Sequence, residues 1–492
     1  MERQELLARL DRPSREPWDI AIVGGGAVGL GAALDAAARG HSCVLFEQHD
    51  FCKGTSSRST KLIHGGVRYL AQGNVSLVRE ALHERGLLLR NAPSLVRPLR
   101  FVVPCYGAME RWYYWTGMKC YDALAGGLGI QPSSVLRTHE VVAAVPGLRK
   151  KNLRGGVVYY DAQFDDARLS IAVARKFLQL GGTPLNYMRV VSLRQENGQI
   201  RGLTVVDEET SQPYEVRAKV VINAAGAFSD DIRRMESPTA TPMIAPSQGI
   251  HLVVDQRFLG ADSAMMIPKT RDGRVLFAIP WLGRAILGTT DTPVATACLE
   301  PKPLPEEVDY LIEHFAEYLD PAPTRDDVRS VFAGLRPLVK PRHEAGATSK
   351  ISREHRVVCS AAGLVSILGG KWTTFRKMSE DVIDFAQDRA GLAKTTPRTR
   401  KLSLEAGIGS DPAAPDKPPH REQVVTAARA EFARTVEDVL ARRFRYLLLD
   451  ALGSVRHART VAEWMAEELN QQEGWVDYQV ESYARLARQY SL

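Results

Sequence analysis

The fold of this chain is decided by the stretch Trp18-Asp-Ile-Ala-Ile-Val-Gly-Gly-Gly-Ala-Val-Gly-Leu-Gly-Ala-Ala-Leu-Asp-Ala-Ala-Ala-Arg-Gly40. Its first residues form a short apolar run typical of a buried parallel strand, and its alanine-rich end predicts a helix. Between them, Gly24, Gly26 and Gly29 have the GxGxxG spacing of a dinucleotide-binding turn. The first glycine permits a tight turn, the second lets the backbone approach a pyrophosphate, and the third lets helix and strand pack closely. The helix N-terminus would add free N–H groups and a positive dipole for the phosphates.

An acidic residue at the end of the next expected strand supports this interpretation. Residues 42–46 predict a second strand, and Glu47 follows it, eighteen positions after Gly29. A carboxylate at about this distance accepts hydrogen bonds from the ribose hydroxyls of a dinucleotide. The alternative is an ordinary glycine-rich turn between a strand and a helix, which does not require this acid. Because no second GxGxxG lies between a strand and a helix, a separate nicotinamide cofactor has no evident site. The bound dinucleotide is therefore expected to be the redox centre.

Length and composition limit the class of protein. The chain has 492 residues, more than one hydrophobic core usually serves, so two or three domains are expected. Hydrophobic residues make up 45% and charged residues 25%, which is ordinary for a globular protein. Apolar stretches are interrupted well before the roughly 20 residues that span a membrane, and residues 1–16 are too polar for a signal peptide. The six cysteines show no CxxC pair and no metal-ligand spacing, so we expect a reducing, cytoplasmic compartment and no metal site.

The net charge of +7 indicates an affinity for anions. Composition alone leaves open whether the anion is a phosphorylated substrate, an acidic lipid or a nucleic acid. We expect no nucleic-acid partner, because the sequence has no long basic run and no zinc-finger or RNP-type motif.

The stretch from Thr55 to Leu70 is dense in small hydroxyls, glycines and cations. Its serines and threonines offer donors for the phosphates or ring edge of a bound cofactor. Gly65 and Gly66 allow the backbone to come close to such a ligand. Arg68 and Tyr69 follow at once and supply an anion-binding cation and a phenolic donor. The alternative is a solvated polar loop.

The end of this stretch, Lys61-Leu-Ile-His-Gly-Gly-Val-Arg-Tyr-Leu70, resembles the signature of FAD-dependent glycerol-3-phosphate dehydrogenases. Further blocks follow in the order of that family: Asp165–Leu169, Asn223–Phe228, Gly288–Asp291, Gly334–Pro337 and Gly369–Arg376. The resemblance covers most of residues 18–387 and little of the last hundred residues. It implies FAD as the cofactor and oxidation of sn-glycerol 3-phosphate to dihydroxyacetone phosphate, with electrons passed to a membrane quinone.

The resemblance and the order of expected elements predict an α/β fold of three parts. A Rossmann-like FAD-binding domain of the glutathione-reductase or D-amino-acid-oxidase type is expected from residues 17–96, 151–232 and 333–392. An antiparallel-sheet substrate domain is expected from residues 97–150 and 233–332. A linker over residues 393–420, rich in Pro, Gly and Ser, then leads to a C-terminal helical cap domain over residues 421–492.

Cofactor-binding positions are carried over from the family where its motifs match this chain. Besides the three glycines of the turn and Glu47, they are Thr55, Ser56, Ser57, Lys61, Ile63, His64, Gly65, Ala225, Gly226, Gly334, Gly370, Lys371 and Thr373. A helix expected from about Thr373 would point its positive N-terminal dipole at the flavin ring.

Four side chains are expected to carry the reaction. Arg68, Arg336 and Lys371 match family positions at the substrate site, where three cations could neutralise a phosphate dianion and hold the C2 oxygen. His251 stands at the position of the family's active-site histidine and is the candidate base, although a lone histidine in a strand is more often a core residue. We assign Arg68 and Lys371 mainly to the phosphate, and His251 with Arg336 to the C2 oxygen. Tyr69 and Thr290 are expected to orient the substrate by hydrogen bonds.

Residues 111–121 crowd aromatic side chains among cations. This composition is typical of a membrane-interface anchor, and also of a helix that packs its aromatics into a core. Together with the basic helix faces expected over residues 421–492, it predicts peripheral association with the inner face of the cytoplasmic membrane through an anionic surface. A homodimer is compatible with the sequence.

Three alternatives stay open. A glycerol-3-phosphate oxidase would keep the same substrate residues and reduce oxygen instead of quinone. Another amine or hydroxy-acid flavoprotein oxidase of this fold would need an arginine facing a carboxylate rather than three cations. A non-enzymatic protein stabilised by flavin would bind FAD that no substrate bleaches.

Overall fold

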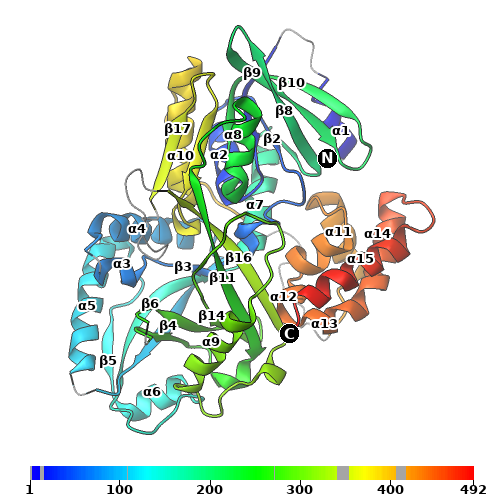
Figure 1. The fold of residues 1–492 in the computed structure, drawn as a ribbon. Coiled ribbons are helices and arrows are strands. Elements are labelled where there is room, and N and C mark those ends of the chain that lie inside the picture. The colour runs from blue at the N-terminus through cyan, green and yellow to red at the C-terminus, as the bar shows by residue number, and fades with distance from the viewer. Residues whose placement is uncertain are drawn as a thin grey trace.

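The computed structural model describes residues 3–11, 16–71, 73–107, 109–270, 272–340, 354–405 and 417–492, without the side chains of Arg68 and Ala71. In these residues the chain forms two large sheets and a group of C-terminal helices (Figure 1).

Strand β1 (Trp18–Val23) lies inside the first sheet, where it pairs in parallel with β10 and β2. Both faces of this part of the sheet are covered, which is why the strand is a nearly continuous apolar run. The strands follow the order β17 (His355–Cys359), β18 (Val365–Gly369), β10 (Pro213–Asn223), β1, β2 (Cys43–Phe46) and β7 (Thr183–Leu185). In addition, β9 (Gln199–Asp207) pairs with β10, and β8 (Met188–Glu196) pairs with β9. The meander expected over residues 189–216 is continuous with the parallel sheet, because β10 pairs first with β9 and then with β1.

Alternate residues of β1 and β2 enter two different cores. On one face, α2 (Ala27–Ala38) packs against α7 (Asp166–Gln179) and α10 (Phe375–Ala390). The small residues of α2 permit this close approach, since a Cβ on Gly31 would lie 2.4 Å from Ser379 Oγ. On the other face lie residues of α1 (Arg3–Ala8), α8 (Ser229–Glu236) and the meander.

The second sheet is mostly antiparallel and lies below the first in Figure 1. Its strands follow the order β15 (Thr292–Pro293), β11 (Ile244–Asp255), β14 (Arg284–Gly288), β13 (Leu276–Trp281), β12 (Ala264–Ile267), β4 (Val96–Pro104), β6 (Gly156–Phe164) and β3 (Leu62–Ile63), with β16 (Ser330–Val339) on β11 and β5 (Ser134–Leu136) on β6. The helices around it are α3 (Val67–Ala71), α4 (Val75–Asn91), α5 (Glu110–Ala125), α6 (Thr138–Ala144) and α9 (Pro305–Ala316).

The strand pairing differs from the division expected from the sequence. Strands β3 and β6 and most of β16 come from segments assigned to the cofactor domain, but they belong to the second sheet. Strand β6 pairs with β4 along its whole length, β3 pairs with β6, and β16 pairs with β11. The strand expected at residues 100–104 begins at Val96, directly after the turn that follows α4.

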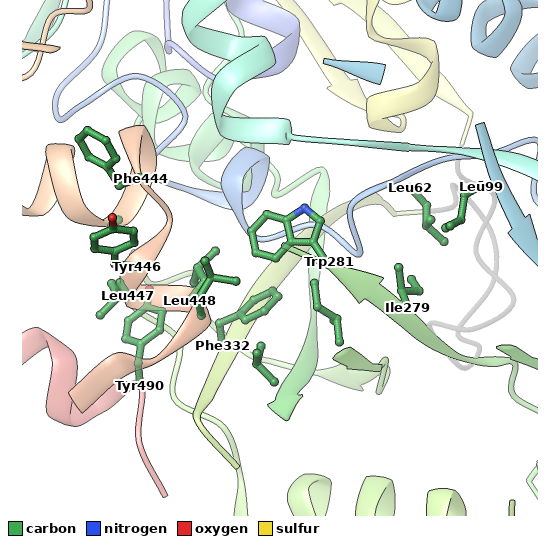
Figure 2. Packing of buried hydrophobic residues seen from close by; sticks show 14 of the residues in the cluster. Leu62, Leu99, Ile279, Trp281, Phe332, Phe444, Tyr446, Leu447, Leu448 and Tyr490 are labelled. Atoms are coloured by element: carbon green, nitrogen blue, oxygen red, sulfur yellow. The ribbon is translucent and has the colours of Figure 1, made fainter. Parts of the chain in front are cut away.

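The C-terminal helices are α11 (Arg421–Ala430), α12 (Tyr446–Leu449), α13 (Ala451–Ser454), α14 (Ala458–Leu469) and α15 (Trp475–Gln489), with a π-helical turn over Asp438–Arg443. They share one apolar cluster with the second sheet, in which Leu448 lies near Phe332 and Trp281, and Tyr490 lies near Leu447 (Figure 2). Full burial of side chains of this size contributes about 1.5–3 kcal/mol each. Among the described residues, no helix is both long and apolar enough to cross a bilayer.

Candidate active site

The turn between β1 and α2 has the geometry that the three glycines predict. Gly24 has a φ of +106°, which an L side chain rarely adopts. A Cβ on Gly29 would lie 1.9 Å from the carbonyl oxygen of Gly24, so only glycine lets the helix sit this close to the strand. Helix α2 begins after Gly26, and Ser56 Oγ accepts a hydrogen bond of 3.0 Å from the Ala27 N–H. The remaining N-terminal N–H groups of α2 are suited to bind phosphate.

Glu47 lies at the end of β2, beside this turn. Its carboxylate accepts hydrogen bonds from the N–H groups of Gly25 (2.7 Å) and His49 (2.9 Å). Burial raises the pKa of Glu47, against the lowering effect of these two hydrogen bonds. The side chain is therefore fixed next to the pyrophosphate turn, where an acceptor for ribose hydroxyls is expected.

A cavity of about 600 Å³ opens between the carboxyl ends of these strands and the facing loops. It is lined by many of the positions predicted to bind the cofactor, namely Gly24, Gly26, Glu47, Thr55, Ser56, Ala225, Gly226, Gly370 and Lys371. Its helix N-terminus and hydroxyls can donate hydrogen bonds and the Glu47 carboxylate can accept them, a combination that fits a dinucleotide.

The sequence interpretation missed part of the cavity wall. The missed lining residues include Met188, Arg189, Val190, Val191, Asp231, Ile232 and Met235. One signal could have found the first four: β8 begins directly after β7, which pairs in parallel with β2 and so ends at the same edge of the sheet.

Other predicted cofactor positions shape the site from behind the cavity wall. Gly29 supports the turn, and Ser57 and Ile63 are buried. Thr373 Oγ1 makes hydrogen bonds to the backbone of His64, and the Gly65 N–H donates to the Tyr121 hydroxyl over 2.8 Å. A Cβ on Gly334 would lie 2.8 Å from the Arg58 carbonyl oxygen.

Lys61 was predicted to bind the cofactor, but its side chain does not line the cavity. Its ammonium group is buried, 2.8 Å from both carboxylate oxygens of Asp166, and it donates to the Ser57 carbonyl over 2.6 Å. Burial of this pair without water requires such full hydrogen bonding. Lys61 therefore anchors the loop before β3 to the start of α7 and does not line the cavity.

Two of the predicted substrate residues, Lys371 and Tyr69, lie together. Lys371 Nζ is 4.0 Å from the centre of the Tyr69 ring, and it would lie 3.6 Å from a Cβ on Gly66. A cation over an aromatic face in this geometry is electrostatically favourable. The side chain of Arg68, which the sequence places in this group, lies outside the described part of the structure.

His251 and Arg336 form a second pair on neighbouring strands. In the register of β11 and β16, His251 lies opposite Phe332, and Gly249 lies opposite Gly334. Alternate residues of a strand share a face, so His251 and Gly249 point to the same side. A Cβ on Gly249 would lie 2.3 Å from Arg336 Nη2, which places the guanidinium over this glycine, next to His251.

The His251 ring is held tightly. Its Nε2 lies 2.9 Å from Thr60 Oγ1, and the ring stacks on Phe332 at 4.8 Å. Burial lowers the pKa of His251 well below its usual value, and the nearby charges of Arg336 and Lys61 lower it further. The imidazole is therefore neutral at physiological pH, as a proton acceptor must be.

Thr290, which was predicted to orient the substrate, makes its hydrogen bonds within the protein instead. Its hydroxyl donates to Glu307 over 2.7 Å and accepts from the Ile250 N–H over 3.1 Å, and the residue is buried. This hydroxyl therefore links α9 to β11 and is not turned to a substrate. The hydroxyl that contacts Arg336 is that of the neighbouring Thr289, which accepts from Arg336 Nη2 over 3.1 Å.

The Lys371 group and the His251 group are connected across the second sheet. Thr373 holds the backbone of His64, whose ring lies edge-on to Phe277 at 6.2 Å. Phe277 pairs with Gly288, and a Cβ on Gly288 would lie 2.4 Å from His251 Cδ2. A path of contacts thus leads from Lys371, which lines the cofactor cavity, to His251. Arg336 comes directly before Pro337, which also lines the cavity.

Comparison with known proteins agrees with this geometry. A family model described as FAD dependent oxidoreductase matches residues 19–376. The chain belongs to this family. A second model, described as the C-terminal domain of alpha-glycerophosphate oxidase, matches residues 377–475. The predictions of an α/β FAD-binding fold, of a C-terminal helical part and of FAD as cofactor are confirmed.

Relatives of this FAD-dependent oxidoreductase are named glycerol-3-phosphate dehydrogenases. The mitochondrial enzyme of Homo sapiens is 36% identical over 535 residues, which cover 96% of this chain and 73% of the human protein. That of Arabidopsis thaliana is 42% identical over 414 residues, covering 81% of this chain and 65% of the plant protein. The crystal structure of the glycerol-3-phosphate dehydrogenase from Bacillus halodurans, complexed with FAD, superposes with a TM-score of 0.80 at 27% identity, covering 99% of this chain and 97% of that one.

Proposed function

We propose that this FAD-dependent oxidoreductase oxidises sn-glycerol 3-phosphate to dihydroxyacetone phosphate. The observation that carries the proposal is the presence of two separate cationic positions: Lys371, which lines the cofactor cavity beside Tyr69, and Arg336, which lies beside His251 directly before the lining residue Pro337. A substrate with a phosphate dianion and an oxidisable hydroxyl needs two such positions. The names of the relatives point to the same substrate.

The roles of the residues follow from their contacts. When bound, FAD would supply the acceptor for the hydride that leaves C2. Lys371 attracts the phosphate, and Tyr69 lies against its ammonium group. Arg336, held by Thr289 and the Gln248 carbonyl, stabilises the negative charge that develops on the C2 oxygen. His251 takes the hydroxyl proton; Thr60 engages Nε2, and Nδ1 has no partner among the described residues.

Replacement of Lys371 by methionine tests the assignment to the phosphate. A charge-assisted hydrogen bond contributes about 1.5–3 kcal/mol, so we expect KM for glycerol 3-phosphate to rise roughly 10- to 150-fold, with a smaller change in kcat. Glycerol lacks the phosphate, so wild type should lose most of its activity when glycerol replaces glycerol 3-phosphate. The variant already lacks the phosphate partner and should lose proportionately less. Steady-state kinetics with an artificial electron acceptor measure both substrates.

Lys377 provides the matched control, because it lies in the first turn of helix α10, six residues after Lys371, and pairs with Asp381. Lys377→Met should keep the KM of wild type. Equal losses of activity on glycerol and on glycerol 3-phosphate in Lys371→Met would show that Lys371 does not bind the phosphate. Equal use of both substrates by wild type would contradict the proposed substrate.

The proposed electron acceptor is a membrane quinone. The second candidate is oxygen, and it is favoured by one observation: the C-terminal family model bears the name of an oxidase. Turnover with a short-chain quinone in the absence of oxygen, compared with hydrogen peroxide formation in air, separates the two. Rapid peroxide formation without quinone reduction would make the enzyme an oxidase.

We further propose that α5 attaches the enzyme to an anionic membrane surface from the cytoplasmic side. Its outer side exposes Trp112 (52%) and Tyr113 (71%), with Met109 (77%) directly before the helix. Trp112 lies near the guanidinium of Arg111. Aromatic and basic side chains in this mixture favour the interface of a bilayer.

Flotation with anionic vesicles tests this attachment. Each basic side chain near the membrane contributes about 1 kcal/mol to the binding free energy, and salt screens this contribution. Binding through inserted aromatic side chains should instead persist in high salt. We expect the salt-resistant bound fraction to disappear in a Trp112→Ala/Tyr113→Ala variant. Tyr478→Ala is the matched control, because Tyr478 is 61% exposed on the C-terminal helix α15. Equal flotation of all three proteins would exclude α5 as the anchor.

A further inference from the structure

The C-terminal helices contact a loop of the cofactor site at both of its ends. This cofactor loop, residues 47–60, follows β2 and supplies a large part of the cavity lining. It also supports the glycine-rich turn. The Cys52 N–H donates to the Gly25 carbonyl over 2.9 Å, and a Cβ on Gly25 would lie 2.7 Å from Phe51 Cδ1. A displacement of the cofactor loop would therefore displace the turn that is expected to bind the pyrophosphate.

Asp50 is the first anchor of the cofactor loop. Its carboxylate is fully buried and accepts hydrogen bonds from Arg442 Nε (2.5 Å) and from Arg443 Nη2 (2.9 Å), both in the π-helical turn of the C-terminal part. Burial alone would raise the pKa of Asp50, but Arg443 and Arg442 outweigh it and lower the pKa. A buried carboxylate with two buried guanidinium partners is costly to separate, because each group left alone would be an unpaired charge.

Two more contacts join the same part of the loop to the C-terminal helices. Lys53 lines the cavity, and its ammonium group lies 2.8 Å from Glu437. Glu437 also accepts from Arg442 over 2.7 Å, which joins this contact to the Asp50 anchor. Phe432 lies edge-on to Phe51, with ring centres 5.3 Å apart.

The second anchor lies at the other end of the cofactor loop. Arg58 donates to Glu300 over 2.6 Å, and the hydroxyl of Tyr490 donates to the same carboxylate over 2.9 Å. Tyr490 is fixed in turn, because its carbonyl accepts from the Val331 N–H of β16 and its ring belongs to the apolar cluster of Figure 2. Glu300 thus bridges the loop to the last turn of the chain.

We propose that the C-terminal helices are a positioning element for the cofactor: they hold the cofactor loop in the conformation that binds FAD, so that their docking and FAD binding stabilise each other. Asp50, Lys53 and Arg58 transmit this coupling as positioning residues. The proposal depends on FAD binding and not on the identity of the substrate. Coupling between two binding events is reciprocal, so each side gives an independent measurement.

The test uses the full-length protein, with FAD affinity and hydrogen exchange as readouts. We expect Asp50→Asn to raise the FAD dissociation constant at least tenfold. In wild type, FAD should slow amide exchange over residues 438–449 at least fivefold, and this effect should be lost in Asp50→Asn. Arg168→Met is the control, because Arg168 makes an equally buried pair with Glu431 of the C-terminal part, at 2.6 Å, from helix α7 and not from the cofactor loop itself.

Gentler changes keep the test decisive if Asp50→Asn does not fold. Tyr490→Phe removes only one hydroxyl and should raise the FAD dissociation constant two- to fivefold, while Arg443→Lys should keep affinity closer to wild type than Arg443→Met. The proposal is overturned if FAD leaves exchange over residues 438–449 unchanged in wild type. It is also overturned if Arg168→Met and the loop variants weaken FAD binding equally, since the contacts would then serve stability alone.

Discussion

His251→Gln is expected to lower kcat for glycerol 3-phosphate by roughly 10²–10⁴-fold, the usual contribution of a general base. Glutamine keeps a hydrogen-bonding group toward Thr60, so the loss reports the missing proton acceptor more than a cavity. KM should change little, because this residue acts on charge that appears only in the transition state. A near-normal kcat with a sharply raised KM would indicate that His251 binds the phosphate and does not act as the base.

The pH dependence of kcat/KM provides a second test of His251 as the general base. That parameter reports the free enzyme, in which burial, Arg336 and Lys61 lower the pKa of His251 well below 6.5. A base with a lowered pKa stays unprotonated as pH falls, so the acid limb of the profile should lie well below pH 6.5 and should vanish in His251→Gln. His314→Gln, a change to a half-buried histidine on α9, is the control and should leave both kcat and the profile unchanged. An acid limb at or above pH 6.5 in wild type would contradict the assignment.

Gly29→Ala is expected to yield protein that loses most of its flavin. The added methyl would lie 1.9 Å from the Gly24 carbonyl oxygen, so the start of α2 must move away from the turn. Overpacking of this kind costs about 1–3 kcal/mol, which corresponds to a roughly 5- to 150-fold rise in the FAD dissociation constant if the strain falls on the bound state. Equilibrium titration of apoprotein with FAD measures it.

Gly117→Ala is the matched control for this substitution. A Cβ on Gly117 in α5 would meet nothing within 4 Å, so the variant should bind FAD as wild type does. Unchanged FAD affinity in Gly29→Ala would show that the closeness of α2 to β1 is not needed for the cofactor.

The cofactor turn was predictable from sequence because its requirements are local. The three glycines and Glu47 act through backbone conformation and a fixed spacing, and the structure places them around one turn. Lys61 shows where such reasoning ends. A lysine in a polar loop can face a phosphate or a carboxylate, and its partner Asp166 is 105 positions away in the chain.

Contacts between distant segments needed the structure. The pairing of His251 with Phe332 and the place of Arg336 over Gly249 depend on the register of β11 and β16, which no local pattern fixes. The family resemblance supplied these residues, but not their arrangement. The ion pairs of Asp50 with Arg442 and Arg443, nearly four hundred positions apart, could not be anticipated from basic residues that look like an exposed helix face.

Under the proposed function, glycerol 3-phosphate reduces the FAD of this enzyme directly. The visible spectrum of the purified holoprotein without oxygen tests it, before and after addition of glycerol 3-phosphate, with glycerol as the control. We expect glycerol 3-phosphate to bleach the flavin band fully within the time of one turnover, and glycerol to leave it nearly unchanged. A flavin band that glycerol 3-phosphate does not bleach, in protein that dithionite reduces, would contradict the account.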